Sequence, residues 1–215
     1  MLKPWWKLVQ FGFRLLYNEF AFTYDTVSKS VSLGAWRCWQ RTALNHLNAE
    51  RGARVLEIAY GTGDLQIDLH NAGYQALGHD LSPYMGRIAS RKLRQHRLPV
   101  RLSRGMSQRL PYADAAFAAV VSTFPAEFIL ASETLREVYR VLQPDGRFVI
   151  VPNAVLTGGD ALVGTIEWLY RITGQRGVET PQTAIEALFA PYGFAAEVLQ
   201  EACPRSVATV IVARK

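Results

Sequence analysis

The sequence is poor in the side chains that form metal centres and disulfide frameworks. It has two cysteines and four histidines in 215 residues, and Cys38 and Cys203 are too far apart to form a metal-binding clip. No cluster of histidine, cysteine or acidic residues has the spacing of metal ligands, so we expect no metal. Two cysteines do not make a disulfide scaffold, and a reducing compartment is therefore the default expectation.

The sequence also offers no candidate membrane span. Nowhere do the roughly 18 uncharged apolar residues of a transmembrane helix run together. The first 20 residues superficially resemble a signal peptide, but Lys7 and Arg14 interrupt the apolar run and no small-residue cleavage site follows. We therefore expect a soluble, cytoplasmic protein. Its hydrophobic content of 49% is sufficient for a sizeable core and excludes general disorder.

Aromatic residues are concentrated in the first 50 residues, which we interpret as an N-terminal helical cap or lid. Polar residues recur there at helical spacing and leave the other helix faces apolar. A second helix is predicted over residues 36–47, with Trp36, Trp39, Ala43 and Leu47 on one side. The first helix either closes an apolar acceptor pocket or lies at a membrane surface with its tryptophans among lipid headgroups. Both alternatives favour a hydrophobic acceptor.

From residue 53 onward, short apolar strands alternate with helices. This alternation predicts an α/β domain over residues 51–215, with a mostly parallel sheet covered by helices on both faces. Residues 153–190 are expected to shape an acceptor pocket. The last two strands are consecutive, so we expect an antiparallel edge. The predicted strands are 54–59, 74–79, 100–102, 116–122, 147–152, 195–200 and 206–212, and the predicted helices are 65–70, 83–94, 135–142, 161–172 and 183–189, with a loop at 174–177.

The sharpest signal is a glycine-containing turn followed by an acid. The stretch VLEIAYGTG ends at Gly63, and Asp80 stands 17 residues later at the end of the next predicted strand. Glycines let the backbone bend tightly and let a ligand approach it. An acid at the tip of the second strand can accept hydrogen bonds from both hydroxyls of a ribose. The combination predicts a nucleoside site, whereas the alternative for Asp80 is a purely structural acid ahead of a helix cap.

The same turn favours S-adenosylmethionine over a dinucleotide. A dinucleotide site normally has a G-x-G-x-x-G run, whereas this turn ends in Asp64, which would repel phosphates. Glu57, inside the first strand, is also unusual for dinucleotide sites. Acidic surroundings suit a ligand that carries a sulfonium. Glu57 either orients the amino group of the cofactor through the turn or is satisfied by backbone donors.

Four stretches resemble the class I S-adenosylmethionine-dependent methyltransferases of the small-molecule type 11 group, which includes the ubiquinone and menaquinone C-methyltransferases. They are VLEIAYGTG, GHDLSPYM, RGMSQRLPYADAAFAAVVSTF and LREVYRVLQPDGRFVIV, and they cover roughly residues 53–152. The upstream residues Tyr17, Asn18, Ala21, Tyr24 and Asp25 are similar to a run that precedes the fold in these enzymes. The resemblance implies a Rossmann-like seven-stranded sheet, mostly parallel, with a C-terminal antiparallel hairpin and an N-terminal helical cap.

The resemblance also implies roles for individual residues. Gly61 and Gly63 would face the methionine part of the cofactor, Asp80 the ribose, and Leu81 and Met85 the adenine. Tyr24 would be a lid residue near the sulfonium, and Ser122, Thr123 and Phe124 would lie between cofactor and acceptor. The full set of expected cofactor-binding residues is Tyr24, Glu57, Ala59, Gly61, Gly63, Asp80, Leu81, Met85, Met106, Ser107, Ser122 and Thr123. S-adenosylhomocysteine would be the product.

The chain departs from the family pattern at several positions. Ala59 replaces the first glycine of the turn and fits if its φ is negative. Tyr60 stands where the family often has a smaller cysteine. Met106 replaces the acid that holds the adenine amino group, which costs about 1 kcal/mol of hydrogen bonding, and Ser107 is a partial substitute. Ala118 replaces an acid at the fourth strand. These departures motivate the alternative of a non-methylating member: a pseudoenzyme, a binding subunit or an enzyme with a repurposed pocket.

No convincing catalytic base emerges from the sequence. His79 precedes Asp80, and strand alternation points it to the opposite side of the sheet, which favours a packing role. Methyl transfer from a sulfonium can proceed largely by in-line placement of the nucleophile. The candidate acceptor-site residues are Tyr17, Tyr24, Thr123, Glu127 and Asn153. The acceptor itself is expected to be a small, hydrophobic or aromatic metabolite.

The net charge of +6 comes from one segment. Residues 86–110 hold eight Lys and Arg and no acid, so the rest of the chain carries +6 − 8 = −2. The eight are Arg87, Arg91, Lys92, Arg94, Arg97, Arg101, Arg104 and Arg109. We interpret this segment as a solvated basic flank at one edge of the sheet rather than a nucleic-acid groove. It could contact anionic headgroups if the N-terminal helix lies on a membrane, so peripheral membrane contact is a further expectation.

Overall fold

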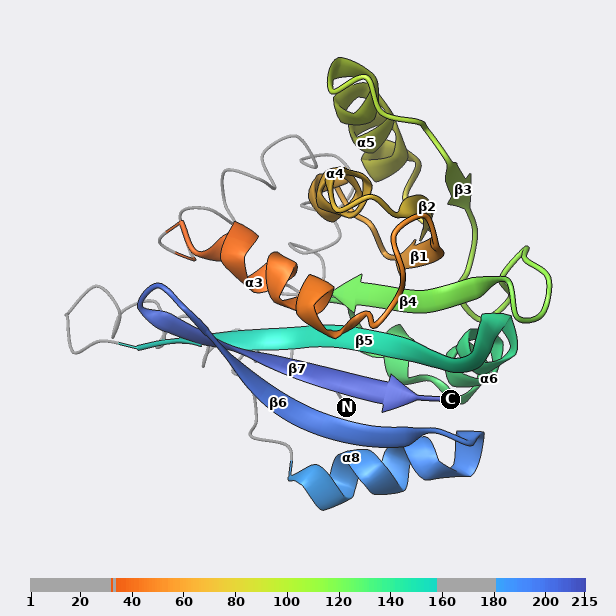
Figure 1. Ribbon diagram of the computed structural model, residues 1–215, viewed down its shortest axis with the longest axis vertical. Coiled ribbons are helices and arrows are strands. Elements are labelled where there is room, and N and C mark those ends of the chain that lie inside the picture. The colour runs from red at the N-terminus through yellow and green to blue at the C-terminus, as the bar shows by residue number, and fades with distance from the viewer. Residues whose placement is uncertain (1–31, 33, 158–180) are drawn as a thin grey trace, which may run out of the picture.

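A computed structural model describes Ser32 and residues 34–157 and 181–215 (Figure 1). In chain order the elements are α3 (Trp36–Thr42), η2 (Ala43–His46), β1 (Arg54–Ile58), α4 (Asp64–Asn71), β2 (Gln75–Asp80), α5 (Pro83–Gln95), β3 (Leu102–Arg104), β4 (Phe117–Thr123), η3 (Glu127–Leu130), α6 (Ser132–Val141), β5 (Leu142–Leu156), α8 (Gln182–Phe189), η4 (Ala190–Tyr192), β6 (Ala195–Cys203) and β7 (Ser206–Arg214). The predicted helix 161–172 and loop 174–177 lie outside the described residues.

The strands form a seven-stranded sheet in the order β3-β2-β1-β4-β5-β7-β6. The pairs among β3, β2, β1, β4 and β5 are all parallel, whereas β7 is antiparallel to both β5 and β6. The predicted mostly parallel sheet with an antiparallel C-terminal hairpin is therefore confirmed. β6 forms one edge of the sheet, and the short β3 forms the other.

Helices cover both faces of the sheet because its central strands are apolar on both sides. On β1, Val55 belongs to one buried cluster, whereas Leu56 and Ile58 belong to the other. The first cluster includes residues of α3 and α4, and the second includes residues of α6 and α8. Figure 1 shows these helices around the sheet, with α8 beside β6. Burial on both faces makes β1 and β4 the fixed centre from which the flanking loops extend.

Helix α5 begins as the sequence predicts. The Ser82 side chain caps the helix by accepting a hydrogen bond of 3.3 Å from the backbone N–H of Met85, and Pro83 occupies the first turn. Met85, Ala89 and Leu93 are buried at four-residue spacing, so the helix packs along one apolar stripe. Its opposite face is left to polar and charged side chains.

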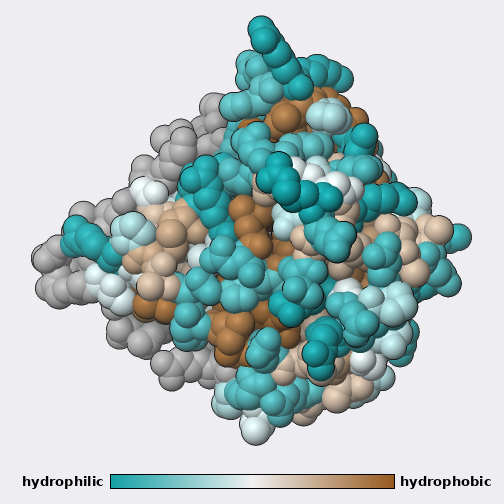
Figure 2. All heavy atoms as spheres, viewed as in Figure 1, coloured by the Kyte–Doolittle hydropathy of each residue, from teal (hydrophilic) through white to brown (hydrophobic). Residues whose placement is uncertain are grey.

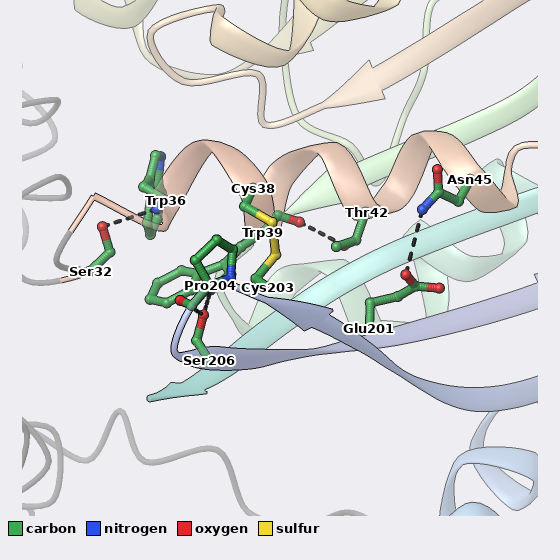
Figure 3. Close-up of a disulfide and its surroundings, with 10 residues drawn as sticks. All are labelled: Ser32, Trp36, Cys38, Trp39, Thr42, Asn45, Glu201, Cys203, Pro204 and Ser206. Carbon is green, nitrogen blue, oxygen red and sulfur yellow. Dashed lines mark hydrogen bonds between the residues drawn. A yellow bond between two sulfur atoms is a disulfide. The ribbon is translucent and has the colours of Figure 1, made fainter. Parts of the chain in front are cut away.

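Helix α3 is attached to the C-terminal hairpin by a disulfide between Cys38 and Cys203 (Figure 3). The indole Nε1 of Trp39 donates a hydrogen bond of 2.8 Å to Ser206 Oγ beside it. As predicted, Trp39, Ala43 and Leu47 are buried on one side of the α3–η2 segment. The sequence-based expectation of a reducing compartment assumed that the two cysteines form no disulfide framework. Because Cys38 and Cys203 are cross-linked, the cysteines no longer support that expectation. The two cysteines are 165 residues apart, so only the fold brings them together.

Ion pairs hold α3 against its other neighbours. Arg37 and Arg41 both contact the Asp68 carboxylate of α4, at 2.7 and 3.1 Å. Immediately after α3, His46 Nε2 lies 2.7 Å from Glu201 Oε1 on β6. Thus α3 is fixed to both α4 and the hairpin. The helix predicted in residues 1–31 lies outside the described residues.

Candidate functional site

The candidate site lies where the direction of the chain across the sheet reverses. From β1 the chain moves outward through β2 to β3, whereas β4, the other neighbour of β1, leads to β5 on the opposite side. Loops leaving the carboxyl ends of β1 and β4 therefore diverge. In open α/β sheets, ligands bind outside the carboxyl ends of the strands at such a point. The glycine turn follows β1 and Asp80 ends β2, so the topology brings them to this edge.

The turn after β1 contains three residues with left-handed backbone. The φ angles are 58° at Ala59, 53° at Gly61 and 83° at Gly63. The sequence-based condition that Ala59 has a negative φ is therefore wrong. For a residue with a Cβ atom this conformation costs roughly 1–2 kcal/mol. The Ala59 N–H donates a hydrogen bond of 2.8 Å to the His79 carbonyl, which holds it there.

Gly61 and Gly63 differ in what surrounds them. Among the described residues, no atom lies within 4 Å of a Cβ atom placed on Gly61, so these residues leave open space beside the backbone at this position. A Cβ atom on Gly63 would lie 2.8 Å from the Cβ of Ala89 on α5. Gly63 is thus required for the close packing of α5 on the turn. Gly61 is the glycine that leaves room for a ligand.

The Asp80 carboxylate connects the two loops of the site. Its Oδ2 accepts a hydrogen bond of 3.0 Å from the Gly61 N–H, and its Oδ1 accepts one of 2.8 Å from the Ser82 N–H. Burial raises the pKa of Asp80, and the two N–H donors oppose that shift. Each carboxylate oxygen has a second lone pair, so Asp80 can still accept hydrogen bonds from a ligand. Asp80 therefore has a structural role in the turn, and its binding of a ribose stays a prediction.

Glu57 lies under the turn rather than in it. It is fully buried on β1, and the side-chain amide of Gln66 on α4 donates a hydrogen bond of 2.7 Å to its Oε2. Burial raises the pKa of Glu57 to about 8, and the neighbouring carboxylates of Asp80, Asp64 and Asp68 add to the rise. The role of Glu57 in cofactor binding stays a prediction. The alternative of backbone donors is not what is seen, because the hydrogen-bond partner is the side chain of Gln66.

Tyr60 is accommodated by two glycines that the sequence analysis did not use. A Cβ atom on Gly78 of β2 would lie 2.6 Å from Tyr60 Cδ1, and one on Gly86 of α5 would lie 3.0 Å from the Tyr60 hydroxyl. The ring thus occupies space that both glycines leave free, and it is buried. Glycine inside a strand often marks such a close approach. That signal could have indicated how the chain accepts a bulky residue here.

Two of the predicted adenine-side residues are exposed and two are not. Leu81 is 61% exposed and Met106 58% exposed, and they follow the carboxyl ends of the adjacent strands β2 and β3. Met85 and Ser107 are buried. Exposed apolar side chains at this position can cover a planar heterocycle. Met85 is buried under the described residues, and its predicted contact with the adenine stays a prediction.

The end of β4 carries a further left-handed residue of the site, the second one that is not a glycine. Phe124 has a φ of 50°, and its ring stacks on Trp36 of α3 with 4.2 Å between ring centroids. Ser122 is buried and its hydroxyl donates a hydrogen bond of 2.8 Å to the Ile58 carbonyl. Ser122 therefore links β4 to β1, and its predicted contact with a ligand stays a prediction. Thr123 is also largely buried.

The remaining candidates are scattered. Glu127 is exposed on η3, and Asn153 lies on β5 opposite Thr209 of β7. Tyr17 and Tyr24 lie outside the described residues. His79 is buried, its Nδ1 lies 2.8 Å from Ser103 Oγ, and burial lowers its pKa, so the predicted packing role is confirmed. The described residues bring no catalytic base and acceptor group together.

The geometry fits a nucleoside better than a phosphate ligand. Asp64 and Asp80 place carboxylates at the turn, and Asp64 is balanced by Lys92, whose Nζ lies 2.9 Å away. Open space at Gly61, free acceptor capacity at Asp80 and the apolar Leu81 and Met106 match a ribose diol and an adenine ring. Acidic surroundings also suit a cationic sulfonium. These residues therefore fit S-adenosylmethionine.

Comparison with known proteins supplies a family. A family model described as the ubiE/COQ5 methyltransferase family matches residues 11–158. A demethylmenaquinone methyltransferase of Deinococcus radiodurans is 37% identical over 158 residues, which are 72% of this chain and 65% of that protein. One of Thermus thermophilus is 36% identical over 139 residues, 63% of each chain. The matched part of this chain thus spans less than two thirds of the length of these relatives.

Solved structures support the fold. The geranyl diphosphate C-methyltransferase of Streptomyces coelicolor, crystallised with Mg²⁺, geranyl diphosphate and S-adenosylhomocysteine, superposes with a TM-score of 0.63 at 12% identity. The similarity covers 87% of this chain and 83% of that one. At this identity the likeness establishes a shared fold and leaves the chemistry to the residues of the site.

Proposed function

Because the chain belongs to the ubiE/COQ5 methyltransferase family, we propose that it binds S-adenosylmethionine and methylates a carbon atom of a quinone-like lipid. The observation that carries the proposal is the arrangement of Asp80 and Gly61 at the carboxyl ends of β2 and β1. There, one carboxylate both fixes the turn and keeps lone pairs for a ribose. The names of the relatives support a quinone as the acceptor.

Four residues would hold the cofactor. Asp80 would accept hydrogen bonds from the ribose hydroxyls, and the open backbone at Gly61 would lie against the methionine part. Leu81 and Met106 would cover the adenine ring from two adjacent loops. When bound, S-adenosylmethionine supplies a methyl group on a sulfonium; the S–CH₃ bond breaks, a bond to the acceptor carbon forms, and the ring proton of that carbon is lost.

The acceptor would lie toward the carboxyl end of β4. The stacked rings of Phe124 and Trp36 give this side of the site an aromatic wall, which is suited to a planar, apolar quinone ring. The chain's contribution to catalysis would be chiefly to align the acceptor carbon with the methyl group and to exclude water. Such positioning can provide about 7–11 kcal/mol of the barrier reduction.

Two measurements test the proposal in order. Calorimetric titration with S-adenosylmethionine and S-adenosylhomocysteine should give saturable binding of both. Transfer of a labelled methyl group to reduced demethylmenaquinone should then give a methylated quinone that mass spectrometry locates on a ring carbon. Absence of binding would overturn the assignment of the cofactor. Binding without transfer to any reduced quinone would favour the non-methylating alternative raised by Tyr60, Met106 and Ala118.

A further inference from the structure

One side of the molecule, made by α5, β3 and the loops around them, carries nearly all of the excess positive charge. We define this basic flank by its exposed cations, which are Arg87, Arg91, Arg94, Arg97, Arg101, Arg104 and Arg109. The eighth cation of the segment, Lys92, is turned toward the site and pairs with Asp64. Within the part of the chain that the structure describes, the other seven form no ion pair with a carboxylate.

The same flank carries exposed apolar side chains. Five large apolar side chains are exposed among the described residues, and four of them lie here: Leu81, Tyr84, Val100 and Met106. Leu81 and Met106 are accounted for by the adenine side of the proposed cofactor site. Tyr84, 40% exposed, and Val100, 37% exposed, have no such explanation. The guanidinium of Arg87 lies 4.6 Å from the centre of the Tyr84 ring, so charge and apolar surface are in direct contact.

Part of the flank is a regular stripe of cations rather than scattered residues. Arg87, Arg91 and Arg94 are spaced by four and three residues and so form one stripe along α5, opposite its buried stripe. β3, the edge strand beside β2, contributes Arg104. Figure 2 shows hydrophilic side chains around an apolar patch at the top of the view, where α5 lies in Figure 1.

We propose that the basic flank docks the protein onto an anionic lipid bilayer. The cations would face the headgroups, and Tyr84 and Val100 would enter the interfacial layer, a combination that is typical of reversible membrane attachment. Leu81 and Met106 form the inner border of the flank, so docking would place the cofactor site next to the bilayer. An acceptor dissolved in the membrane could then reach the site without crossing water.

A membrane fits this surface better than a nucleic acid. The described flank is a helix face and a sheet edge, not a groove that could follow a phosphate backbone. The choice of a bilayer rests in one respect on the proposed function, because a lipid-like acceptor resides there. Arg101 and Arg104 also protect an edge strand from pairing with other chains. That role does not account for the stripe on α5.

The test is co-sedimentation of the full chain with vesicles. We expect binding to phosphatidylcholine vesicles that contain phosphatidylglycerol, little binding to phosphatidylcholine alone, and release as the Debye length falls to about 3 Å at 1 M salt. The triple variant Arg87→Glu, Arg91→Glu, Arg94→Glu should bind at least about 100-fold more weakly, since each cation contributes about fivefold. Its cofactor affinity and circular dichroism should match those of the wild type.

The matched control is Arg51→Glu, Arg136→Glu, Arg214→Glu, which changes the net charge equally at exposed arginines outside the flank. Full retention of vesicle binding by this control supports the proposal. An equal loss of vesicle binding in both triple variants would mean that binding depends on the net charge and not on the position of the cations, and this result would overturn the proposal. Tighter binding of RNA than of anionic vesicles, abolished by the flank variant, would also overturn it. Vesicle binding is measured without methyl transfer. A protein that fails to bind vesicles can therefore be distinguished from one that fails to bind the cofactor or to transfer the methyl group.

Discussion

The carboxylate of Asp80 accepts a hydrogen bond of 3.0 Å from the backbone N–H of Gly61. This contact connects the end of β2 to the turn after β1 across two adjacent parallel strands. It holds the turn in the shape that leaves open space at Gly61. The geometry of the turn therefore depends on the same side chain that we propose to bind the ribose.

Asp80→Asn should weaken cofactor binding without unfolding the protein. Asparagine keeps the shape and one acceptor oxygen, but its NH₂ group cannot accept a hydrogen bond, so either Gly61 or Ser82 loses its acceptor and the ribose loses the charge. We expect an affinity loss of about 10- to 100-fold, corresponding to hydrogen bonds to a charged group. Calorimetry with S-adenosylhomocysteine measures it. Asp114→Asn, at an exposed carboxylate on the far end of the sheet, is the control and should bind normally.

The two glycines of the turn should respond differently to alanine. Gly61→Ala adds a methyl group to open space at a φ of 53°, so it should cost about 1 kcal/mol of stability and yet impair cofactor binding. Gly63→Ala forces contact with Ala89 as well, so it should cost about 2–4 kcal/mol. Urea unfolding and calorimetry separate the two effects. The prediction fails if Gly61→Ala binds the cofactor like the wild type.

Ala59→Gly should stabilise the protein by about 1 kcal/mol. The substitution removes the Cβ atom that makes a φ of 58° unfavourable, and this gain exceeds the extra flexibility of the unfolded chain. Urea unfolding provides the measurement. Ala72→Gly, at a φ of −72° at the end of α4, is the matched control and should destabilise. Destabilisation by both substitutions would contradict the prediction, because it would mean that the left-handed conformation at Ala59 costs less than the added flexibility of the unfolded chain.

Glu57 should make stability depend on pH in a defined direction. Its pKa is about 8 in the folded state and 4.5 as a free side chain, so between these values the folded protein holds a proton that the unfolded chain has released. The free energy of unfolding should therefore fall as pH rises from about 4.5 to 8, and change little through this group above that range.

Glu57→Gln should remove this part of the pH dependence. A glutamine can donate to Gln66 Oε1, which has no partner among the described residues, and can accept from Gln66 Nε2. The free energy of unfolding of the variant, relative to that of the wild type, should increase from about pH 4.5 to 8 and level off above pH 8. Unfolding in urea at several pH values measures it, and the exposed Glu50→Gln serves as control. Parallel pH profiles for wild type and Glu57→Gln would contradict the assignment.

The Cys38–Cys203 disulfide should contribute to stability through the long loop that it closes. Cys38→Ser with Cys203→Ser should lower the free energy of unfolding by about 2–5 kcal/mol. Dithiothreitol should lower the stability of the wild type to a similar level and leave the double variant unchanged. Thiol titration of the purified, unfolded protein should find no free thiol before reduction and two after it. Two free thiols before reduction would contradict the pairing.

Local signals in the sequence predicted much of the molecule. The strand–turn–helix pattern around VLEIAYGTG, the Ser82–Pro83 helix start and the consecutive last strands each depend on neighbouring residues, and each was found as expected. Asp80 and Gly61 were identified for the same reason, because their spacing places Asp80 at the end of β2 and Gly61 in the turn after the adjacent strand β1.

Contacts between distant segments were decided by the fold alone. Cys38 with Cys203, Trp36 with Phe124, and Tyr60 between Gly78 and Gly86 involve pairs that no local pattern relates. The burial of Met85 and Ser122 was not predicted either, because a side chain's exposure depends on which elements pack over it. The sequence by itself determined the order of the elements and the acid and glycines of the site. Tertiary packing decided which of those side chains remain free to meet a ligand.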